Sequence, residues 1–399
     1  ILFQVTTQSK LLNIKSRMVA ATNICCYGMF LAIISNIFGA SFAFPPEYDH
    51  GVSLPTTRPL VIAHRGASGI LPEHTVEAYQ LAIEQGADII ECDLSVSKDL
   101  QLLCLHESWM NETTDVEEKF PEKNATYFVQ DQGREITDYF TVDFTLAELK
   151  NLRINQRFWS RDPSKDGLYS IATLEEYIQV AQNASRPIGI YPETKEPEWV
   201  NSLDIIKNAN TSFERLLIDV LESYGYTKPT DPCFVQSFSF DSLLSLKNMT
   251  DLPLIRLMRS QIYYSEEDLK EAAEICYGIG PSKTHIFKVS EETNWITETT
   301  NLTQTAHNLG LRIHPYTFRN EHEYLAFDYG LDPYEELEKF LELEIDGYFT
   351  DFPATVVRYL NATYIESNNN GDNSAVASTP FLSTYICMLL SCLCFARYY

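Results

Sequence analysis

Ionisable side chains lie at the ends of two apolar segments that otherwise have the character of buried strands. His64 and Arg65 follow the apolar run VIA, and Glu91 and Asp93 are two residues apart in IIECDL. Side chains two apart on a strand share one face. Two unpaired carboxylates among apolar neighbours are costly to bury, so the pattern predicts a bound cation.

A third carboxylate, Glu193, ends a later apolar run beside Lys195, and His106 ends another. Three carboxylates offer only hard oxygen ligands, which suits Ca²⁺ or Mg²⁺ and suits Zn²⁺ poorly. His64 and His106 would flank this ion, where two histidines suit general acid and base work near neutral pH. The alternative for the acidic pair is a solvent-facing edge or a structural site paired with arginine.

Short apolar runs alternate with segments of helical period between about residues 60 and 360, which is typical of parallel β/α units. Eight strands is the number of a (β/α)8 TIM barrel, an α/β fold whose chemistry collects at the carboxyl ends of the strands. The link between the second and third expected strands has hairpin length, so we expect a bend or splay at Ser97–Leu100. The expected strands are residues 59–64, 87–96, 101–106, 187–193, 233–238, 253–258, 311–318 and 345–351, with helices at 75–86 and 174–184.

Residues 107–144, after the third expected strand, contain no convincing strand or long helix. This insertion is rich in aromatic residues and carries two N-x-[ST] sequons. A loop of this length in a compact domain is usually functional or disordered. The aromatic content predicts a lid or substrate-facing insertion over the barrel mouth; the alternative is a decorative glycosylated loop.

The ordered set of HRG, LPEHT, GADIIECD, a strand ending in His and YPETK resembles the glycerophosphodiester phosphodiesterase family, in particular its exported, long-loop branch. Later segments extend the resemblance over roughly residues 60–360: VDFTLAEL, QSF, HPYTFR and DGYFTDFP. The resemblance implies the same barrel fold and one divalent cation. It also implies roles for individual residues: acid and base for His64 and His106, metal ligands for Glu91, Asp93 and Glu193, and phosphate-binding cations for Arg65 and Lys195.

Two further strand-end residues, Phe238 and Tyr316, are candidates for shaping the alcohol pocket, with a purely structural role as the alternative. Two positions depart from the family pattern. His74 stands in LPEHT where the family usually has Asn, and Leu100 stands in SKDL where Gly is expected. We expect the first to affect efficiency and the second to affect the geometry of the hairpin.

The resemblance implies metal-dependent hydrolysis of a small-molecule glycerophosphodiester to an alcohol and glycerol 3-phosphate. The residues leave open whether water or the glycerol 2-hydroxyl attacks. Alternatives are a lysophospholipase D or phosphoinositide phospholipase-like activity, and a non-catalytic surface glycoprotein on the same barrel.

The net charge is strongly negative, with 55 acidic and 30 basic residues and a formal charge of −25. Nucleic-acid binding requires stripes of Lys and Arg that release counterions. No such stripe is present in the sequence, so we expect no nucleic-acid partner. An anionic substrate would need a local source of positive charge, such as a metal ion and a few placed cations.

Four of the nine cysteines lie in the expected barrel: Cys92, Cys104, Cys233 and Cys276. Four in a domain of this size do not form a disulfide scaffold. Cys92 alternates with Glu91 and Asp93, whereas Cys104 has the same parity as His106. We therefore expect the thiols of Cys92 and Cys104 on opposite faces and unpaired.

The two ends of the chain carry targeting signals. Residues 1–43 contain an apolar stretch behind three basic residues, with Met18 a candidate start and Ala43 a candidate cleavage position; they predict a cleaved signal region, with a membrane anchor as the alternative. A linker (44–59) precedes the barrel. A polar spacer (361–380) and a short hydrophobic tail (381–399) follow it, which predicts a lipid-anchor signal, with a membrane helix as the alternative.

Seven N-x-[ST] sequons are spread along the chain, which favours passage through the secretory pathway. Together with the two ends, they predict a glycoprotein at the extracellular face of the cell surface, associated with the membrane through its tail. The sequence leaves the oligomeric state open. The sequon asparagines are Asn111, Asn124, Asn183, Asn210, Asn248, Asn301 and Asn361.

Overall fold

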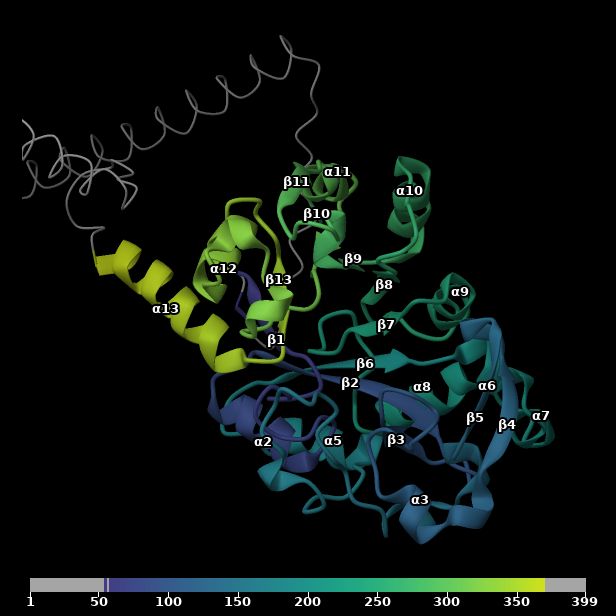
Figure 1. Ribbon diagram of the computed structural model, residues 1–399. Helices are drawn as coiled ribbons and strands as arrows, with labels where there is room; N and C mark the ends of the chain where they lie inside the picture. The colour runs from purple at the N-terminus through teal and green to yellow at the C-terminus, as the bar shows by residue number, and fades with distance from the viewer. Residues whose placement is uncertain (1–53, 56, 370–399) are drawn as a thin grey trace, which may run out of the picture. The chain divides into compact units, whose positions relative to one another are not determined.

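The computed structural model describes residues 54–55 and 57–369. The predicted signal region, most of the linker and the hydrophobic tail lie outside these residues. In the described part, eight parallel strands form a nearly closed barrel, as the sequence predicts (Figure 1). In spatial order they are β12 (Arg312–Ile313), β9 (Gly278–Pro281), β8 (Leu254–Met258), β7 (Val235–Ser237), β6 (Gly189–Thr194), β2 (Ile89–Val96), β1 (Leu60–Ala63) and β13 (Gly347–Thr350).

The barrel closes between β12 and β13 through a thin seam of backbone hydrogen bonds. The amide of Asp346 donates to the Ile313 carbonyl at 2.9 Å, and the amide of Phe318 donates to the Phe349 carbonyl at 2.8 Å. One isolated parallel bridge, Phe318 with Thr350, completes the contact. The other neighbouring barrel strands are joined by parallel pairing, which is shortest between β6 and β7, where Glu193 is opposite Gln236.

The assignment of the third expected strand to the barrel was wrong. Strand β3 (Leu102–Cys104) pairs antiparallel with β2, with Leu94 opposite Cys104, and lies outside the barrel. The hairpin turn contains Leu100 with φ of 61°, so Leu occupies the left-handed conformation that favours Gly. The missing barrel strand is β9, whose sequence GIGP lacks the β-branched run that identifies a strand.

The antiparallel pairing also corrects the expected separation of Cys92 and Cys104. Cys104 of β3 is opposite Leu94 of β2. Cys92 lies two residues before Leu94 on β2, so the side chains of Cys92 and Cys104 are on the same face. The two sulfur atoms are 2.8 Å apart and unbonded. The parity argument failed because β3 is not the next parallel barrel strand.

Helices cover the outside of the barrel and begin at the residues that sequence capping rules favour. Thr75 and Thr173 each accept a hydrogen bond from a backbone amide in the first turn of the following helix. The helices around the barrel are α2 (Val76–Glu84), α5 (Leu174–Gln182), α6 (Pro197–Ser202), α7 (Asp204–Asn208), α8 (Phe213–Ser223), α9 (Phe240–Lys247), α10 (Glu266–Ile275), α11 (Leu302–Asn308), α12 (Pro333–Leu341) and α13 (Pro353–Asn369).

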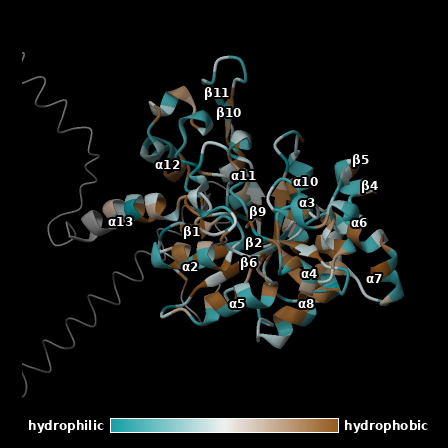
Figure 2. Cartoon of the chain, turned by 60° about the horizontal axis from the view of Figure 1, so that its bottom comes forward, coloured by the Kyte–Doolittle hydropathy of each residue, from teal (hydrophilic) through white to brown (hydrophobic). Residues whose placement is uncertain are grey.

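Two layers of hydrophobic packing hold the barrel together. One cluster fills its interior and includes Ile62, Ile89, Tyr191, Phe234 and Phe349. A larger one lies between the strands and the helices. Figure 2 shows hydrophobic colour gathered around the central strands, while β5 and α10 are mostly hydrophilic. The polar residues at the strand ends are therefore carried on a rigid, apolar frame.

The insertion is more regular than the sequence predicts. It contains α3 (Val116–Lys119) and a hairpin of β4 (Ala125–Val129) and β5 (Arg134–Asp138). Its residues Met110 and Phe144 share a third hydrophobic cluster with α4 (Leu146–Leu149). A further hairpin, β10 (Phe287–Val289) and β11 (Ile296–Thr299), precedes α11.

Aromatic side chains attach the insertion to the barrel instead of covering its mouth, contrary to expectation. The rings of Tyr127 and Phe140 pack against Trp199 of α6, with centroids 5.6 and 5.3 Å away. Besides Glu107, the polar turn Gln130–Gln132 comes nearest to the mouth, where it lines a neighbouring cavity. The insertion therefore borders the site with polar groups.

All seven sequon asparagines are exposed, as expected of positions that could carry sugar. Among the described helices, none combines the length and the apolar character needed to span a membrane.

Candidate active site

The first turn after β1 aims His64 and Arg65 into the barrel mouth. Arg65 has φ of 60° and Gly66 has φ of 84°. A Cβ atom at Gly66 would lie 2.7 Å from the carbonyl carbon of Ala78, so only Gly fits against α2. The HRG triplet is therefore a tight turn packed on a helix, and both of its ionisable side chains line the cavity.

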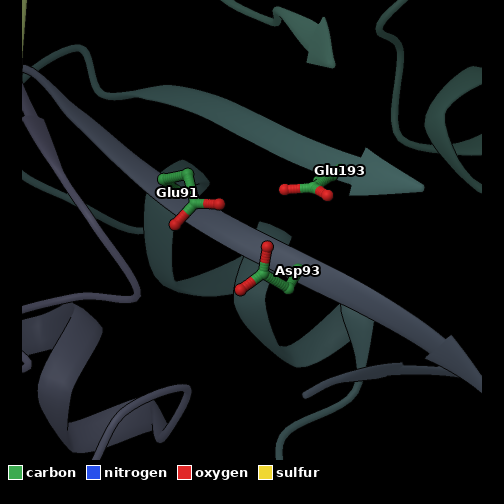
Figure 3. A group of neighbouring side chains, drawn as sticks. All are labelled: Glu91, Asp93 and Glu193. Atoms are coloured by element: carbon green, nitrogen blue, oxygen red, sulfur yellow. The ribbon is translucent and has the colours of Figure 1, made fainter. Parts of the chain in front are cut away.

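Three carboxylates converge on neighbouring strands, as the sequence predicts. Glu91 and Asp93 project from β2, and Glu193 projects from β6 into the same space (Figure 3). The parallel register places Asp93 opposite Glu193. One oxygen from each of the three carboxylates lies within 4.8 Å of the others, which is the spacing of ligands that share one ion.

The electrostatics of this carboxylate cluster favour a bound cation. Burial and the neighbouring carboxylates, Asp93 foremost, raise the pKa of Glu91 well above its usual range despite Arg65. Burial likewise raises the pKa of Glu193, although Lys195 opposes the shift. Burial alone would also raise the pKa of Asp93, but Lys195, His106 and Arg65 hold it well below its usual range. A donor set of buried, mutually repelling carboxylates fits a hard divalent cation.

The two predicted phosphate-binding cations border the cluster. The Nζ atom of Lys195 is 3.2 Å from Glu193 Oε1 and 3.3 Å from His106 Nε2. The backbone amide of Arg65 donates to Glu91 Oε2 at 2.8 Å, and its guanidinium lies 3.2 Å from Asp93 Oδ2. Both side chains are buried, so they present positive charge at the floor of the mouth.

His64 is held by a buried carboxylate at the end of β13. Its Nδ1 lies 2.6 Å from Asp351 Oδ1. Burial would raise the pKa of Asp351, but Arg319, His64 and Arg161 hold it well below its usual range. An ionised Asp351 can only accept, so Nδ1 of His64 carries the hydrogen and its Nε2 keeps a free lone pair. Burial, with Arg65, lowers the pKa of His64 to about 4, so the ring is neutral at neutral pH.

His106 is held by the first residue of the insertion. Its Nδ1 is hydrogen-bonded to Glu107, which also pairs with Arg157. Burial, with Arg65 and Lys195, lowers the pKa of His106 to about 3. His106 Nε2 then accepts from Lys195. Each predicted catalytic histidine thus belongs to a histidine–carboxylate pair.

One short segment holds both pairs. Residues 155–161, here called the arginine segment, carry Arg157 on Glu107 and Arg161 on Asp351. Arg157 also contacts Glu73, which pairs in turn with Arg65 at 2.9 Å. The arginine segment therefore links the supports of His64, His106 and Arg65, although none of its residues was predicted from the sequence.

Two more side chains contact the metal-site carboxylates directly. His74, at the position that departs from the family pattern, places Nε2 2.9 Å from Asp93 Oδ2 and Nδ1 2.8 Å from the Tyr79 hydroxyl. Gln236 donates to Glu91 Oε1 at 3.0 Å. Within the described residues, the Gln236 Oε1 atom is buried without a hydrogen-bond partner while the side chain lines the cavity.

All nine predicted site residues line one cavity of about 370 Å³ at the barrel mouth. Phe238 and Tyr316 form its aromatic wall, with ring centroids 6.1 Å apart and perpendicular planes. A second cavity of about 270 Å³ shares Glu193, Lys195 and Phe238 with the first. Its other wall comes from Gln130–Gln132 of the insertion and from residues 196–198.

Comparison with known proteins matches this arrangement to one family. The model of the glycerophosphoryl diester phosphodiesterase family matches residues 64–355, which is most of the chain. The chain belongs to this family. Its members are phosphodiesterases, so this chain is classed as a hydrolase acting on glycerophosphodiesters.

Relatives extend the family match across the barrel. The glycerophosphodiester phosphodiesterase GDPD6 of Arabidopsis thaliana is 39% identical over 343 residues, covering 80% of this chain and 91% of the relative. A glycerophosphodiester phosphodiesterase of Haemophilus influenzae is 29% identical, and the match covers 75% of this chain and 89% of the relative.

Solved structures support the fold of the phosphodiesterase. A family protein from Silicibacter pomeroyi superposes with a TM-score of 0.56 at 18% identity, over 78% of this chain and 95% of the other. An Oleispira antarctica phosphodiesterase, solved with the product sn-glycerol-3-phosphate, superposes with a TM-score of 0.51 at 20% identity. The match covers 76% of this chain and 97% of the other. At this level of identity the likeness shows the fold alone.

Proposed function

We propose that this phosphodiesterase hydrolyses glycerophosphodiesters to an alcohol and glycerol 3-phosphate in a metal-dependent reaction with histidine acid and base. The observation that carries the proposal is the convergence of three buried carboxylate oxygens within 4.8 Å. Glu91, Asp93 and Glu193 would hold one Ca²⁺ or Mg²⁺ ion. When bound, such an ion polarises a phosphoryl oxygen and offsets its negative charge.

The chain's own residues supply the remaining steps. Arg65 and Lys195 attract and orient the phosphodiester, whose charge the acidic protein surface would otherwise repel. One histidine, neutral, takes a proton from the attacking oxygen at its Nε2. The other acts as the acid in its protonated form, which the negative charge of a bound phosphodiester favours, and donates its Nε2 proton to the leaving alkoxide. After product release, the first histidine gives up its proton and the second regains one from solvent. The ionised partners Asp351 and Glu107 hold the rings in orientation and stabilise each imidazolium as it forms.

The walls of the two cavities support a choice of first substrate. Phe238 and Tyr316 provide an apolar surface beside the phosphate-binding groups. The neighbouring cavity carries Asp131, Glu196 and Glu198 against Arg259 and Lys195. This acidic side favours a neutral or cationic alcohol over an anionic one, so glycerophosphocholine is the substrate to test first.

The deciding experiment measures glycerophosphocholine hydrolysis with and without EDTA, and with Ca²⁺ or Mg²⁺ restored. We expect EDTA to abolish turnover, and Glu91→Gln to lower kcat/KM by about a thousandfold or more. The matched control is Glu214→Gln, because Glu214 is a buried carboxylate on α8 that binds Ser242 away from the cavity. Wild-type turnover in Glu91→Gln, with normal folding of both variants, would refute the metal assignment.

The same assay separates the alternatives. A lysophospholipase D would cleave lysophosphatidylcholine at least as well as glycerophosphocholine, and a phosphoinositide phospholipase would cleave the corresponding inositol lipid. A non-catalytic surface glycoprotein would bind without turnover at any metal concentration. The completeness of both histidine–carboxylate pairs supports the catalytic proposal over the last of these.

The proposal includes a location outside the cytosol, at a membrane through the C-terminal tail. The exposure of all seven sequon asparagines supports it. Removal of N-glycans should increase electrophoretic mobility of the cellular protein, and a phospholipase that cleaves lipid anchors should release it from membranes. An unglycosylated protein in the cytosolic fraction would contradict this location.

A further inference from the structure

Two sulfur atoms lie in contact between the barrel strands and the surrounding helices of the phosphodiesterase, close to the proposed catalytic groups but unused by the proposed reaction. Cys92 Sγ and Cys104 Sγ are 2.8 Å apart. Both side chains are fully buried in the cluster between strands and helices, with Tyr79 and Tyr177. The separation is shorter than ordinary non-bonded contact between sulfur atoms, and about 0.8 Å longer than a disulfide bond.

The strand geometry that brings the sulfurs together is fixed by the hairpin. Strand β3 runs antiparallel to β2, and the pairing continues to the bond from the Leu105 amide to the Asp93 carbonyl at 3.0 Å. Cys104 is opposite Leu94, so Cys92 is its diagonal neighbour on the same face. The two side chains therefore extend from the same face of neighbouring strands, which allows their sulfur atoms to come into contact.

The surroundings give the two thiols little other bonding. Cys104 Sγ has a backbone carbonyl, that of Thr173, at 3.7 Å, and Cys92 Sγ has its neighbour's at 3.4 Å. Thiols are weak donors, so these long contacts stabilise a reduced pair only slightly. Within the described part of the chain, Cys233 and Cys276 are also buried, but neither has a second sulfur in contact.

We propose that Cys92 and Cys104 form a disulfide bond in the mature protein. The bond would join β2, which carries Glu91 and Asp93, to β3, which leads directly to His106. It would therefore act as a covalent brace between the metal-binding strand and one catalytic histidine.

The chemistry is thiol–disulfide exchange with a disulfide oxidant such as glutathione disulfide. One cysteine thiolate attacks a sulfur of the oxidant and expels a glutathione thiolate, giving a mixed disulfide. The second cysteine then displaces the other glutathione. Two thiols lose two protons and two electrons, and one oxidant becomes two glutathione thiols. Because both sulfurs are buried between the strands and the helices of the folded protein, the exchange takes place before these elements have packed together.

The test traps free thiols in the full chain made through the secretory pathway of eukaryotic cells. The protein is denatured with N-ethylmaleimide and without reductant, digested, and analysed by mass spectrometry. We expect a linked pair of peptides containing Cys92 and Cys104, lighter by two hydrogen atoms than the reduced pair. Cys233 and Cys276 in the same sample should be alkylated, which makes them internal controls.

The opposite results are equally clear. Full alkylation of Cys92 and Cys104, at the level seen for Cys233 and Cys276, would overturn the proposal. A linkage from either cysteine to a different one would also overturn it. Because these readings need no mutant and no activity, they stay separate from success or failure of the proposed hydrolysis.

A stability measurement adds a second, independent reading. The wild type refolded in glutathione redox buffer should melt roughly 5 °C higher than the same protein refolded in reductant. The double variant Cys233→Ala/Cys276→Ala should keep this difference, and Cys92→Ala/Cys104→Ala should lose it. Equal melting temperatures in the two buffers for the wild type would count against the bond.

Discussion

The two histidine–carboxylate pairs of the site differ in where they come from and how deeply they are set. His64 and Asp351 lie at the ends of β1 and β13, and Asp351 has a side-chain exposure of only 1%. His106 and Glu107 lie where β3 passes into the insertion, with exposures of 25% and 17%. One half of the proposed acid–base apparatus therefore belongs to the barrel and the other half to the junction of β3 with the insertion.

The difference teaches that the insertion is part of the active site even though its aromatic residues do not cover the mouth. It supplies Glu107, and the arginine segment just beyond it supplies a guanidinium to each pair. Barrel-borne groups are rigid because strands fix them. Insertion-borne groups depend on a separate hydrophobic cluster for their position.

The largest expected effect comes from removing either histidine. His64→Ala and His106→Ala should each lower kcat/KM for glycerophosphocholine by about a thousandfold, because each abolishes one proton transfer. With a phosphodiester that has a p-nitrophenol leaving group, the variant lacking the general acid should recover and the other should not. If the two variants lost kcat/KM equally on both substrates, the two histidines would not have distinct acid and base roles.

A smaller effect should separate the two carboxylates. Asp351→Asn leaves Arg161 and Arg319 facing a neutral amide inside the protein, so we expect about a hundredfold loss of kcat and a destabilisation of about 3 kcal/mol. Glu107→Gln, at the more exposed pair, should cost about tenfold in kcat and little stability. Steady-state kinetics and guanidinium unfolding measure both. A larger loss in Glu107→Gln would reverse the proposed order of the pairs.

The arginine segment offers a finer test of the same contrast. Arg161→Lys should lower kcat severalfold with a nearly unchanged KM, because a lysine cannot reproduce the contacts of a buried guanidinium to Asp351 and to the Ser68 carbonyl. Arg157→Lys should act more weakly through Glu107. The distant ion pair of Arg312 with Asp346 provides the control, and Arg312→Lys should leave kcat unchanged.

The parts of the site that followed from the sequence are those tied to strand ends. The spacing of Glu91 and Asp93 placed both on one face, and Glu193 ended a second strand in the same order as in the family. Asp351 also ends a strand, within the DGYFTDFP segment, and this position was the signal that could have identified it. Arg157 and Arg161 follow no strand or helical pattern, so only the folded chain shows what they contact.

The fold itself was predicted to the level of architecture but not of every strand. β9 was missed because Gly278 and Gly280 leave it without side chains that mark a strand; a Cβ atom at these positions would approach Arg312 and Leu257, respectively, to 2.6 Å. β3 was placed in the barrel because a short apolar run does not reveal its direction. Both errors arise from packing across strands, which sequence spacing alone does not encode.

The smallest expected effect concerns pH and a third buried histidine, His314, whose Nδ1 lies 3.0 Å from the Tyr191 hydroxyl. Burial, with Arg312, lowers the pKa of His314 to about 4. Since the unfolded histidine titrates near 6.5, the unfolded state binds the extra proton first. Stability is therefore present above pH 6.5 and falls as the pH drops toward 4, by about 2 kcal/mol at pH 5 for such a group.

Guanidinium unfolding at pH 7 and pH 5 measures this dependence. His314→Gln should lose less stability than the wild type over that interval, because one buried titrating ring is gone. An unchanged difference would mean that His314 is protonated in the folded state. His64 and His106 should behave similarly, their pKa values being lowered to about 4 and about 3.

The thin seam between β12 and β13 has a consequence for motion. Strand β12 contains only two residues, and its contact with β13 relies on a few isolated backbone bonds. Cooperative opening of a protein starts where the fewest bonds must break. Local opening of the barrel should therefore begin between β12 and β13. Deuterium should enter the amides of Phe318 and Phe349 sooner than those of the β2–β6 interface, where the proposed metal ligands lie.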